Sequence, residues 1–364
     1  MLLSAGNSIH TIRWANGLER AGVAVVLVSQ QALIAGLSSG VRYYQLRDFG
    51  QPGYFLNALF LRKILRKESP DLLHAHYASG YGTTARLAGY SPLLLSVWGA
   101  DVYDVPSRSR LHRLLVKANL HAADRVASTS HVMARQVQLL APDIDDTEIT
   151  PFGVDTELFA PLKHHALASE PEIVIGTVKT LTDKYGIDTL IDSFALLRSR
   201  LAAIRPNIAA RLRLRIAGEG PLRSALEARA NERGIGHVTT FTGFVPHHLV
   251  PDELRRLDIY VALSRLDSES FGVAVIEAGA CGLPVVVSDA GGLPEVVSVN
   301  RTGFVVPRDN PVAASQALET LVLDPELRSS MGIEARRRVV NLYDWNNNVA
   351  TMISLYRSML SAHT

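Results

Sequence analysis

The chain has 364 residues, which is more than a single hydrophobic core usually supports, so we expect two domains. Hydrophobic residues make up 47% and charged residues 20%, a balance that is typical of ordered globular proteins and excludes a disordered chain. The net charge is +2, but residues 1–140 carry 15 Lys and Arg against 7 Asp and Glu, whereas the remainder carries 22 against 28. This asymmetry indicates either that the N-terminal half meets an anionic partner or surface, or that it has an ordinary solvated basic face.

The single cysteine, Cys281, excludes an internal disulfide, and no cluster of Cys and His has the spacing of a metal site. The chain does not open with a basic segment followed by a long apolar stretch. No apolar run approaches the roughly 20 residues that a membrane-spanning helix needs. We therefore expect a cytoplasmic protein without a secretory signal, structural zinc or membrane span.

Short apolar runs alternate with longer amphipathic segments in both halves, and this pattern predicts α/β domains with mostly parallel sheets. The predicted strands are, in chain order, Ala24–Ser29, Asp71–His74, Leu93–Val97, Arg125–Ser128, Ile173–Val178, Arg213–Ala217, Val238–Thr242, Ile259–Ala262 and Pro284–Ser288. Residues 142–170 contain several prolines and have no periodicity, which indicates a domain boundary with a hinge near residues 160–170. A last helix over Asn346–Leu360 could belong to either domain.

The most informative segment covers residues 264–282. It follows the predicted strand Ile259–Ala262 with a polar loop and then an apolar helix, for which we expect Ser270 as the N-cap and Gly282 as the end. A helix that starts directly after a strand and a polar loop presents unpaired backbone amides at its first turn. The segment therefore predicts an anion site.

Three amides lie at this predicted helix start, those of Phe271, Gly272 and Val273. Together with the positive end of the helix dipole they suit a diphosphate, and Gly272 has no side chain to keep the anion away. Glu277 lies two helical turns beyond the cap and could bind a ribose diol, while Glu269 precedes the helix and could bind sugar hydroxyls. Either glutamate alone is explained as well by an ordinary surface position, but the pair in this context favours a nucleotide-sugar site.

Glu269 and Glu277, with seven residues between them, resemble the signature of the retaining glycosyltransferases of family 4. Residues 282–286, 289–297 and 302–306 are similar to the blocks that follow this signature in the family. The resemblance extends over nearly the whole chain. It implies the GT-B fold, in which two doubly wound, Rossmann-like α/β domains face a central cleft.

The resemblance also implies a division of labour between the two domains. Residues 1–165 would form the N-terminal, acceptor-binding domain, with a helix of residues 346–364 packing back on it. Residues 166–345 would form the C-terminal domain that binds the nucleotide sugar.

Residues 176–186 resemble the family's loop after the first strand of the second domain, where an Arg and a Lys five residues apart neutralise the donor diphosphate. This chain has Lys179 and Lys184 at that spacing, so the positive charge is kept but the bidentate geometry of arginine is lost. By the same resemblance, three further residues would lie beside the nucleoside and its base: Gly218, Phe244 and Val245.

In the N-terminal half, Gly6 belongs to a loop that resembles the one facing the donor phosphates in the family. Residues 96–103 match a block in which many relatives carry a histidine followed by an acidic residue. Trp98 occupies the histidine position, and Asp101 retains the acidic position, which the resemblance makes catalytic. The candidates that could replace the missing histidine at the acceptor are His10, His74 and His76, and each could equally be a hydrogen-bonded structural residue.

The resemblance implies a retaining, metal-independent hexosyltransferase that moves a sugar from a nucleotide-diphosphate sugar to a saccharide or lipid-linked acceptor in bacterial-type polysaccharide or glycolipid biosynthesis. We expect no cofactor beyond this co-substrate and no nucleic-acid partner, and UDP is preferred over GDP because uridine donors are commoner in such families. In a front-face reaction the leaving diphosphate takes the acceptor proton, so stabilisation by Lys179, Lys184 and the helix start becomes the main catalytic contribution.

Two alternatives remain at this point: a sugar-nucleotide epimerase or hydrolase on the same fold, and a non-catalytic partner subunit. The presence of Lys184, Glu269 and Glu277 argues against the second.

Two segments of the N-terminal half combine cations with apolar residues, namely Arg62–Lys67 and Arg108–Lys117. Such segments can direct basic side chains toward anionic headgroups, so we expect a peripheral enzyme on the inner face of the cell membrane. The alternative is that both helices bury their apolar faces and leave only solvated charge outside.

Overall fold

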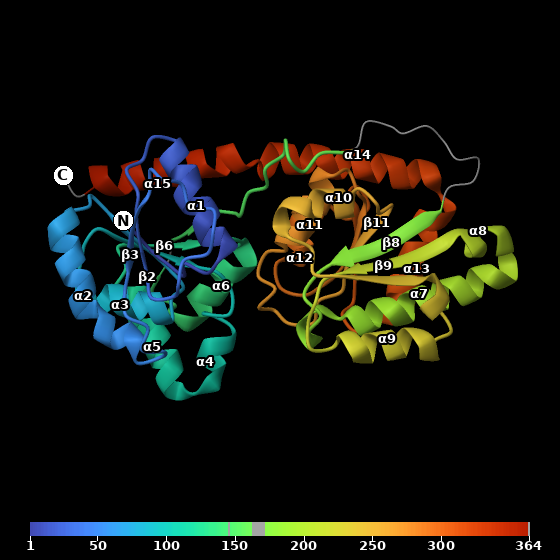
Figure 1. Ribbon diagram of the computed structural model, residues 1–364, viewed down its shortest axis with the longest axis horizontal. Coiled ribbons are helices and arrows are strands. Elements are labelled where there is room, and N and C mark those ends of the chain that lie inside the picture. The colour runs from blue at the N-terminus through green and yellow to red at the C-terminus, as the bar shows by residue number, and fades with distance from the viewer. Residues whose placement is uncertain (145, 162–171, 363–364) are drawn as a thin grey trace. The chain divides into compact units, whose positions relative to one another are not determined.

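The computed structural model describes residues 1–144, 146–161 and 172–362, and the chain divides into two compact α/β units (Figure 1). Unit 1 comprises Met1–Gly153 and Asn346–Thr364, and unit 2 comprises Val154–Trp345. The predicted domain boundary between residues 165 and 166 lies outside the described residues, as does most of the predicted hinge. The chain passes from unit 1 to unit 2 at residues 153 and 154 and returns at residues 345 and 346.

Unit 1 is built on a parallel sheet whose described strands have the order β3-β2-β1-β4-β5-β6-β7. The strands are β1 (Leu2–Leu3), β2 (Val26–Ser29), β3 (Arg42–Gln45), β4 (Leu73–His76), β5 (Leu93–Val97), β6 (Arg125–Ser128) and β7 (Thr147–Ile149). The strand order reverses between β1 and β4. In open α/β sheets, ligands bind at the carboxyl ends of the strands at such a switch point.

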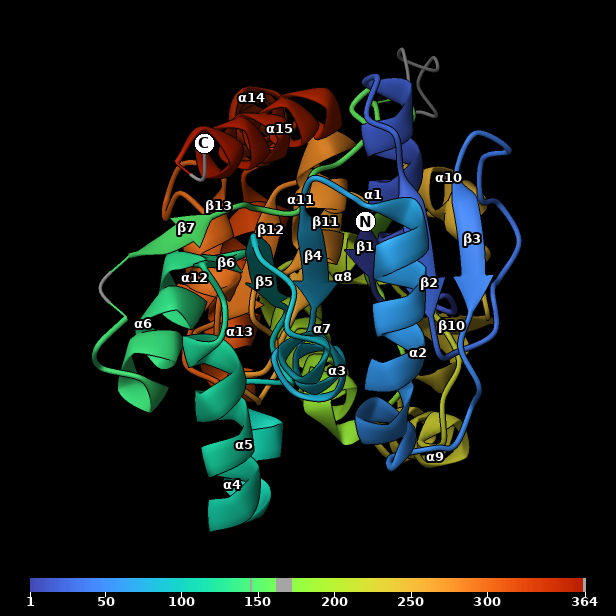
Figure 2. The same ribbon diagram turned by 90° about the vertical axis from the view of Figure 1, so that its left-hand side faces the viewer.

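Helices cover both faces of this sheet. They are α1 (Ile9–Arg20), α2 (Gly53–Glu68), α3 (Gly80–Ala88), α4 (Asp104–Arg108), α5 (Arg110–His121), α6 (His131–Leu140) and α15 (Trp345–Ser361). One core cluster joins alternate strand residues such as Leu3 and Val28 to α2, α3, α5 and α6. Figure 2 shows α3 and α5 on one side of the strands and α1 and α15 on the other.

Unit 2 contains a second parallel sheet, with the strand order β10-β9-β8-β11-β12-β13 among the described residues. The strands are β8 (Ile173–Val178), β9 (Leu212–Ala217), β10 (Thr239–Gly243), β11 (Ile259–Ala262), β12 (Val285–Ser288) and β13 (Gly303–Val306). Its switch point lies between β8 and β11. The loops that carry Lys179 and Glu269 therefore start from neighbouring strand ends.

The helices of unit 2 are α7 (Ile187–Ile204), α8 (Pro206–Arg211), α9 (Arg223–Glu232), α10 (Val250–Leu254), α11 (Val273–Ala280), α12 (Leu293–Val296), α13 (Pro311–Leu323) and α14 (Pro325–Leu342). In the described part of unit 2, 3-10 turns cover Asp183–Tyr185, Gly236–Val238 and His247–Leu249. The core includes Phe194, Leu197 and Leu201 of α7, which are fully buried against the sheet.

The predicted α/β class with two doubly wound parallel sheets is confirmed. The predicted N-cap of α11 is wrong, because this helix begins at Val273 and its N-cap is Gly272. Gly272 has a φ of 91°, a left-handed conformation that glycine adopts freely and that a residue with a side chain, such as serine, adopts only under strain. Among the described residues, no helix is both long and apolar enough to cross a bilayer.

The C-terminal helix α15 is tied to the sheet of unit 1 by a buried hydrogen-bond chain. The hydroxyl of Tyr356 lies 2.7 Å from Nδ1 of His74, and Nε2 of His74 lies 2.7 Å from the hydroxyl of Ser96 on β5. His74 is almost completely buried, so removal of its partner would leave a polar atom without compensation.

We predict that Tyr356→Phe lowers the free energy of unfolding of unit 1 by about 1–3 kcal/mol, the cost of an unsatisfied buried polar group. Urea denaturation followed by tryptophan fluorescence measures this loss. Ser358→Ala is the matched control, because Ser358 donates only to the carbonyl of Leu355 within the same helix. Equal stability of the two variants would contradict the anchoring of α15 through His74.

Candidate functional site

Loops at the carboxyl ends of the unit 2 strands approach one another so closely that side chains are excluded. Gly218, which follows β9, has a φ of 138°, and a Cβ atom at this position would overlap the carbonyl oxygen of Lys179 in the loop after β8. Gly292, in the loop after β12, packs against the carbonyl of Ser270 in the same way, and its amide donates to the carbonyl of Glu269 at 2.9 Å. These contacts fix the backbone on both sides of the switch point.

Lys179 and Glu269 form a nearly buried ion pair at this point. Nζ of Lys179 lies 3.0 Å from Oε1 of Glu269, and the two side chains are 11% and 8% exposed. Burial lowers the pKa of Lys179, but the charge and hydrogen bond of Glu269 together with the nearby Tyr260 and Tyr185 outweigh this effect, and the pKa lies above its ordinary value. The lysine therefore stays charged in a site of low dielectric, where a charge acts most strongly on its neighbours.

Lys184 comes from the 3-10 turn that follows and reaches the same loop. Its Nζ donates to the carbonyl of Ser268 at 2.9 Å. The aromatic ring of Tyr185 lies beside both cations, with its centroid 4.6 Å from Nζ of Lys179 and 5.6 Å from Nζ of Lys184. The structure thus brings together Lys179, Lys184 and Glu269, as the sequence predicted for one site. Sequence reasoning missed Tyr185, although it is adjacent to Lys184.

Glu277 is buried on α11, and its Oε1 lies 3.0 Å from Nε2 of His247. His247 is half-exposed and was not predicted as a site residue. His247 lies shortly after Phe244 and Val245 in the sequence. Its position next to this predicted base-binding segment is the only sequence feature that could have identified it as a site residue. Phe244 is 74% exposed and Val245 is half-buried, and neither contributes to the core cluster of unit 2.

The start of α11 differs in detail from the prediction. Because Gly272 caps the helix, the amides without an intrahelical partner begin at Val273 and Ala274. Ser270 and Phe271 are buried, and the ring of Phe271 packs edge-on against Tyr343 at 5.6 Å. The predicted site residues Ser270 and Phe271 thus hold the loop in place, whereas Gly272 and Val273 form the helix start itself.

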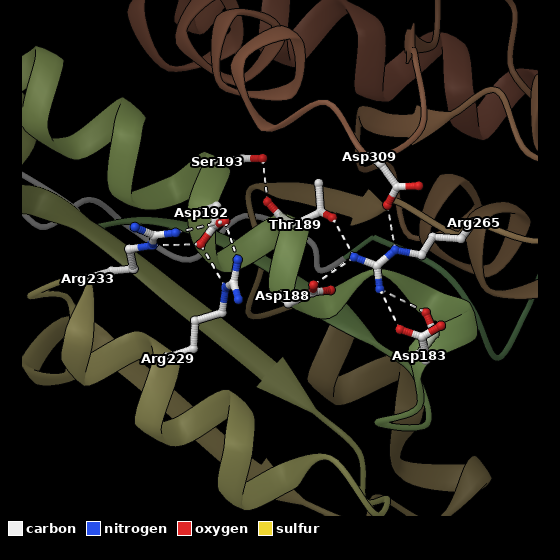
Figure 3. A network of polar contacts seen from close by, with 9 residues as sticks. All are labelled: Asp183, Asp188, Thr189, Asp192, Ser193, Arg229, Arg233, Arg265 and Asp309. Atoms are coloured by element: carbon white, nitrogen blue, oxygen red, sulfur yellow. Dashed lines mark hydrogen bonds and ion pairs between the residues drawn. The ribbon is translucent and has the colours of Figure 1, made fainter.

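A network of charges connects the loop after β8 to the loop after β11 (Figure 3). Arg265 pairs with Asp183 at 3.0 Å and with Asp188 at 2.7 Å, and it also contacts Asp309. Its backbone amide donates to the carbonyl of Lys184 at 2.8 Å. Arg265 thereby fixes the turn that carries Lys184. In the part of the chain that the structure describes, no group of three His, Cys, Asp or Glu side chains has the arrangement of a metal site.

In unit 1, His74 is the second residue of β4 and His76 is its last, and both are almost completely buried. His74 is held by Tyr356 and Ser96, and Nδ1 of His76 lies 2.9 Å from the hydroxyl of Ser4. Burial lowers the pKa of His76 to about 3 and moves the pKa of His74 well below its ordinary range. Both rings are therefore neutral and have hydrogen-bond partners within the protein.

Asp101 is also buried, and its carboxylate accepts hydrogen bonds from the amides of Ala78, Trp98 and Gly99 at 2.7, 3.1 and 2.8 Å. Burial raises the pKa of Asp101, although these hydrogen bonds oppose the rise. The carboxylate joins the loop after β4 to the loop after β5. This geometry fits a residue that positions the two loops better than the catalytic role that the resemblance implied.

Trp98 is the centre of an aromatic cluster at the same strand ends. Its ring lies 4.3 Å from the ring of His76, 5.3 Å from that of Phe152 and 6.2 Å from that of His10. His10 is half-buried at the start of α1 and also packs against Phe152 at 4.8 Å. The amide of Gly6 donates to the hydroxyl of Ser29 at 2.7 Å, which fixes the loop between β1 and α1.

Unit 1 also contains a large pocket of about 1220 Å³ that reaches the carboxyl ends of β1 and β4. It is bordered by the loops after these strands, by α2, and by α4 and α5. The residues that line it are Ala5, Asn7, Ser8, Gln31, Gln51, Pro52, Tyr54, Phe55, Leu56, Tyr77, Ser79, Gly80, Tyr81, Thr83, Val105, Arg108, Leu111, His112 and Leu115. The sequence did not predict this pocket, because its lining comes from five separate segments.

Both halves of the chain match known protein families. Residues 161–338 match the family described as glycosyl transferases group 1, and residues 1–130 match the family described as glycosyl transferase 4-like.

Two curated proteins illustrate the similarity in sequence. The chain is 30% identical over 375 residues to the D-inositol 3-phosphate glycosyltransferase of Jonesia denitrificans, covering 91% of this chain and 82% of that protein. It is 29% identical over 288 residues to the GDP-mannose-dependent alpha-(1-6)-phosphatidylinositol monomannoside mannosyltransferase of Mycolicibacterium smegmatis, covering 75% of this chain and 72% of that protein.

Solved structures with the same fold include a sucrose-phosphate synthase from Thermosynechococcus elongatus, with a TM-score of 0.84, 22% identity and coverage of 99% and 98% of the two chains. HepE from Anabaena in complex with UDP has a TM-score of 0.78 and 14% identity, with 98% of both chains covered. At these identities the similarity concerns the fold, which is GT-B.

We predict that Gly218→Ala destabilises unit 2 by about 3 kcal/mol or more, because the added methyl group would force the loop of Lys179 to move. Gly234→Ala is the matched control, since Gly234 also has a positive φ, of 72°, but no atom lies within 4 Å of the added methyl group. Its loss should be limited to backbone strain of about 1–2 kcal/mol. Urea denaturation compares the two variants, and equal losses would contradict the close approach at Lys179.

Proposed function

We propose that this chain, which belongs to the group 1 family of glycosyl transferases, transfers a sugar from a nucleotide-diphosphate donor to a saccharide or lipid-linked acceptor with retention of configuration at the anomeric carbon. The observation that carries this proposal is the convergence of Lys179, Lys184 and Glu269 at the switch point of unit 2, beside the start of α11. This combination of cations, helix amides and a carboxylate suits a diphosphate linked to a sugar.

In this proposal each polar group of unit 2 has a separate task at the donor. Lys184 and the amides at the start of α11 bind the diphosphate. Glu277 accepts hydrogen bonds from the ribose hydroxyls and exchanges its contact with His247 for them. Glu269 binds hydroxyls of the sugar, and Lys179 keeps Glu269 oriented while adding positive charge near the leaving group. Gly218, Phe244 and Val245 border the nucleoside.

The chemical step that we propose is a front-face displacement. The acceptor hydroxyl forms a bond to the anomeric carbon as the bond to the diphosphate breaks, and the leaving phosphate oxygen takes the hydroxyl proton. No protein base is needed, because the leaving group itself is the base, and the cations and helix amides stabilise the diphosphate in place of a metal ion. Stabilisation of the departing diphosphate by fixed cations and amides in a site of low dielectric supplies the main catalytic effect.

The expected preference for UDP over GDP has no support among the relatives. The protein from M. smegmatis is GDP-mannose-dependent by name, whereas HepE was solved with UDP. We therefore propose a nucleotide-diphosphate sugar as the donor and leave the base unrestricted.

For the acceptor, the names of the two curated relatives specify an inositol phosphate and a phosphatidylinositol mannoside. We propose by analogy that the acceptor of this chain is a hydroxylated ring that carries a phosphate or a lipid and that binds to unit 1. His10 is the histidine that we expect to contact it, because His10 is only half-buried whereas His74 and His76 are almost completely buried. Trp98 would form the apolar floor beside His10.

We further propose that the enzyme works at an anionic membrane surface. Residues 49–67 and 105–123 contain no Asp or Glu, and each stretch carries four Lys or Arg. Leu59 on α2 and Leu114 on α5 are 63% and 62% exposed, so these helices do not bury all of their apolar side chains. Exposed cations beside exposed leucines favour binding to anionic lipid.

The first prediction from this function is that Glu277→Ala weakens binding of the nucleotide, UDP or GDP, that the wild type binds. We expect a loss of affinity of about ten- to 150-fold, because a hydrogen bond to a charged group contributes roughly 1.5–3 kcal/mol. Glu269→Gln should leave nucleotide affinity nearly unchanged and lower the rate of sugar transfer, because in this proposal Glu269 contacts the sugar and not the nucleotide. Isothermal titration calorimetry measures the affinities, and Glu232→Ala on the exposed end of α9 is the control. Unchanged nucleotide affinity in Glu277→Ala would refute the ribose assignment.

The second prediction concerns the membrane. We expect the protein to sediment with vesicles in proportion to their phosphatidylglycerol content and to be released by salt, because each cation near an anionic surface contributes about 1 kcal/mol. The double variant Lys63→Gln/Arg66→Gln should bind more weakly than the wild type. Arg205→Gln/Arg256→Gln changes the charge by the same amount on exposed residues of unit 2 and should bind normally. Equal recovery on neutral and anionic vesicles at low salt would rule out this proposal.

A further inference from the structure

We propose that the pocket of unit 1 binds the apolar chain of a lipid-linked acceptor, while the polar head of that acceptor lies at the carboxyl ends of β1 and β4. This inference rests on the proposed function, because it names the class of acceptor that unit 1 takes. A soluble saccharide would use only the polar part of the pocket.

The lining of the pocket is divided in the way that an amphiphile requires. Polar residues from the loops after β1 and β4, among them Asn7, Ser8 and Ser79, lie where the strand order reverses. Apolar residues come from the surrounding helices: Phe55 and Leu56 of α2, Val105 of α4, and Leu111 and Leu115 of α5. The pocket thus joins a polar switch point, where ligands of α/β sheets bind, to an apolar region between helices.

The apolar side chains of this lining are so exposed to solvent that they indicate a binding surface. Phe55 and Leu56 are 50% and 51% exposed, and Leu111 is 76% exposed. Contiguous exposed apolar side chains around a concave site mark a binding surface in soluble proteins. The volume of about 1220 Å³ exceeds the roughly 300–1,000 Å³ of ordinary small-molecule sites, which leaves room for a chain in addition to a sugar.

Hydrogen bonds hold the inner wall of the pocket in a fixed shape. Nε2 of Gln31 donates to the hydroxyl of Tyr54 at 3.1 Å, and the hydroxyl of Tyr81 donates to Oε1 of Gln31. Burial raises the pKa of Tyr77 and of Tyr81 to about 12, so both hydroxyls stay neutral. A rigid, neutral wall of this kind is suited to an uncharged chain and needs no rearrangement to admit it.

The charges around the pocket favour a lipid with an anionic headgroup over an apolar segment of another protein. None of the described residues that line it is an Asp or Glu, and Arg108 contributes a cation. Further cations, Arg110 and Arg113, are exposed on α5. A phosphate between the polar head and the chain of the lipid would meet this positive border, whereas an apolar protein segment carries no such anion.

The probe for this site is 11-(dansylamino)undecanoic acid, an anionic amphiphile whose fluorescence rises in apolar surroundings. We expect saturable binding by the wild type and about tenfold weaker binding by Leu56→Gln/Leu111→Gln, because both side chains line the pocket and lose apolar contact. Leu139→Gln/Leu342→Gln is the matched control: these leucines lie on α6 and α14, are similarly accessible at 69% and 49%, are not part of the lining and lie outside the two basic segments. Circular dichroism verifies that both variants are folded.

Equal binding by the pocket variant and the wild type would overturn the proposal, and so would an equal loss in the control variant, which would indicate general adhesion to the helix surfaces. Hydrogen exchange of the wild type provides a second test without any substitution. The probe should slow exchange at α2, α5 and the loop after β4, and the absence of protection there would count against the pocket. A dimer that dissociates in the pocket variant would assign the surface to a second copy of the chain instead.

Nucleotide binding by the same variants separates this inference from the proposed function. Calorimetry should give wild-type affinity for UDP or GDP in the pocket variant, because the nucleotide is bound by unit 2. A wild type that binds the probe and neither nucleotide would refute the proposed donor site and leave the pocket standing. A wild type that binds nucleotide but shows no pocket-dependent probe binding would refute the pocket alone.

Discussion

Backbone segments at the carboxyl ends of the unit 2 strands pack against one another without intervening side chains, and the candidate donor site depends on this packing. Gly218 lies against the carbonyl of Lys179, Gly186 against that of Leu263, and Gly292 against that of Ser270. Each contact joins loops from two neighbouring strands, so the four loops form one unit. The side chains that they carry are therefore positioned by close-packed backbone rather than by flexible surface turns.

The buried ion pair of Lys179 and Glu269 is better explained by a role in the reaction than by a contribution to the stability of the fold. Removal of two charges from water costs several kcal/mol per ion, and their attraction offsets this only when the geometry is good. A buried pair at a switch point keeps a cation and a carboxylate in fixed positions before a ligand arrives, which reduces the reorganisation needed during reaction. Arg265 helps to hold the turn that carries Lys184 in place, because it forms ion pairs with Asp183, Asp188 and Asp309 around this turn.

The sequence predicted buried strands such as Leu93–Val97 and Ile259–Ala262 with their observed bounds, because their apolar runs are continuous. It missed the edge strands Arg42–Gln45 and Thr147–Ile149, whose side chains are only partly buried and therefore show no apolar run. Most of the residues that we propose for the donor site could be named from the sequence, because one short motif carries them. His247 and the pocket of unit 1 were not predicted, since they arise from tertiary contacts between segments with no pattern of their own.

Trp98 occupies the position at which the resemblance to family 4 implies a histidine. The indole packs on the rings of His76, Phe152 and His10, so this region is an aromatic surface. An apolar surface at the strand ends binds the flat, hydrocarbon face of a sugar or inositol ring, and its hydroxyl groups must then be recognised by neighbours. The loop after β1, which carries Ser8 and leads into His10, supplies such neighbours and also borders the large pocket. Recognition of the ring and of an attached lipid would thus be continuous along one loop.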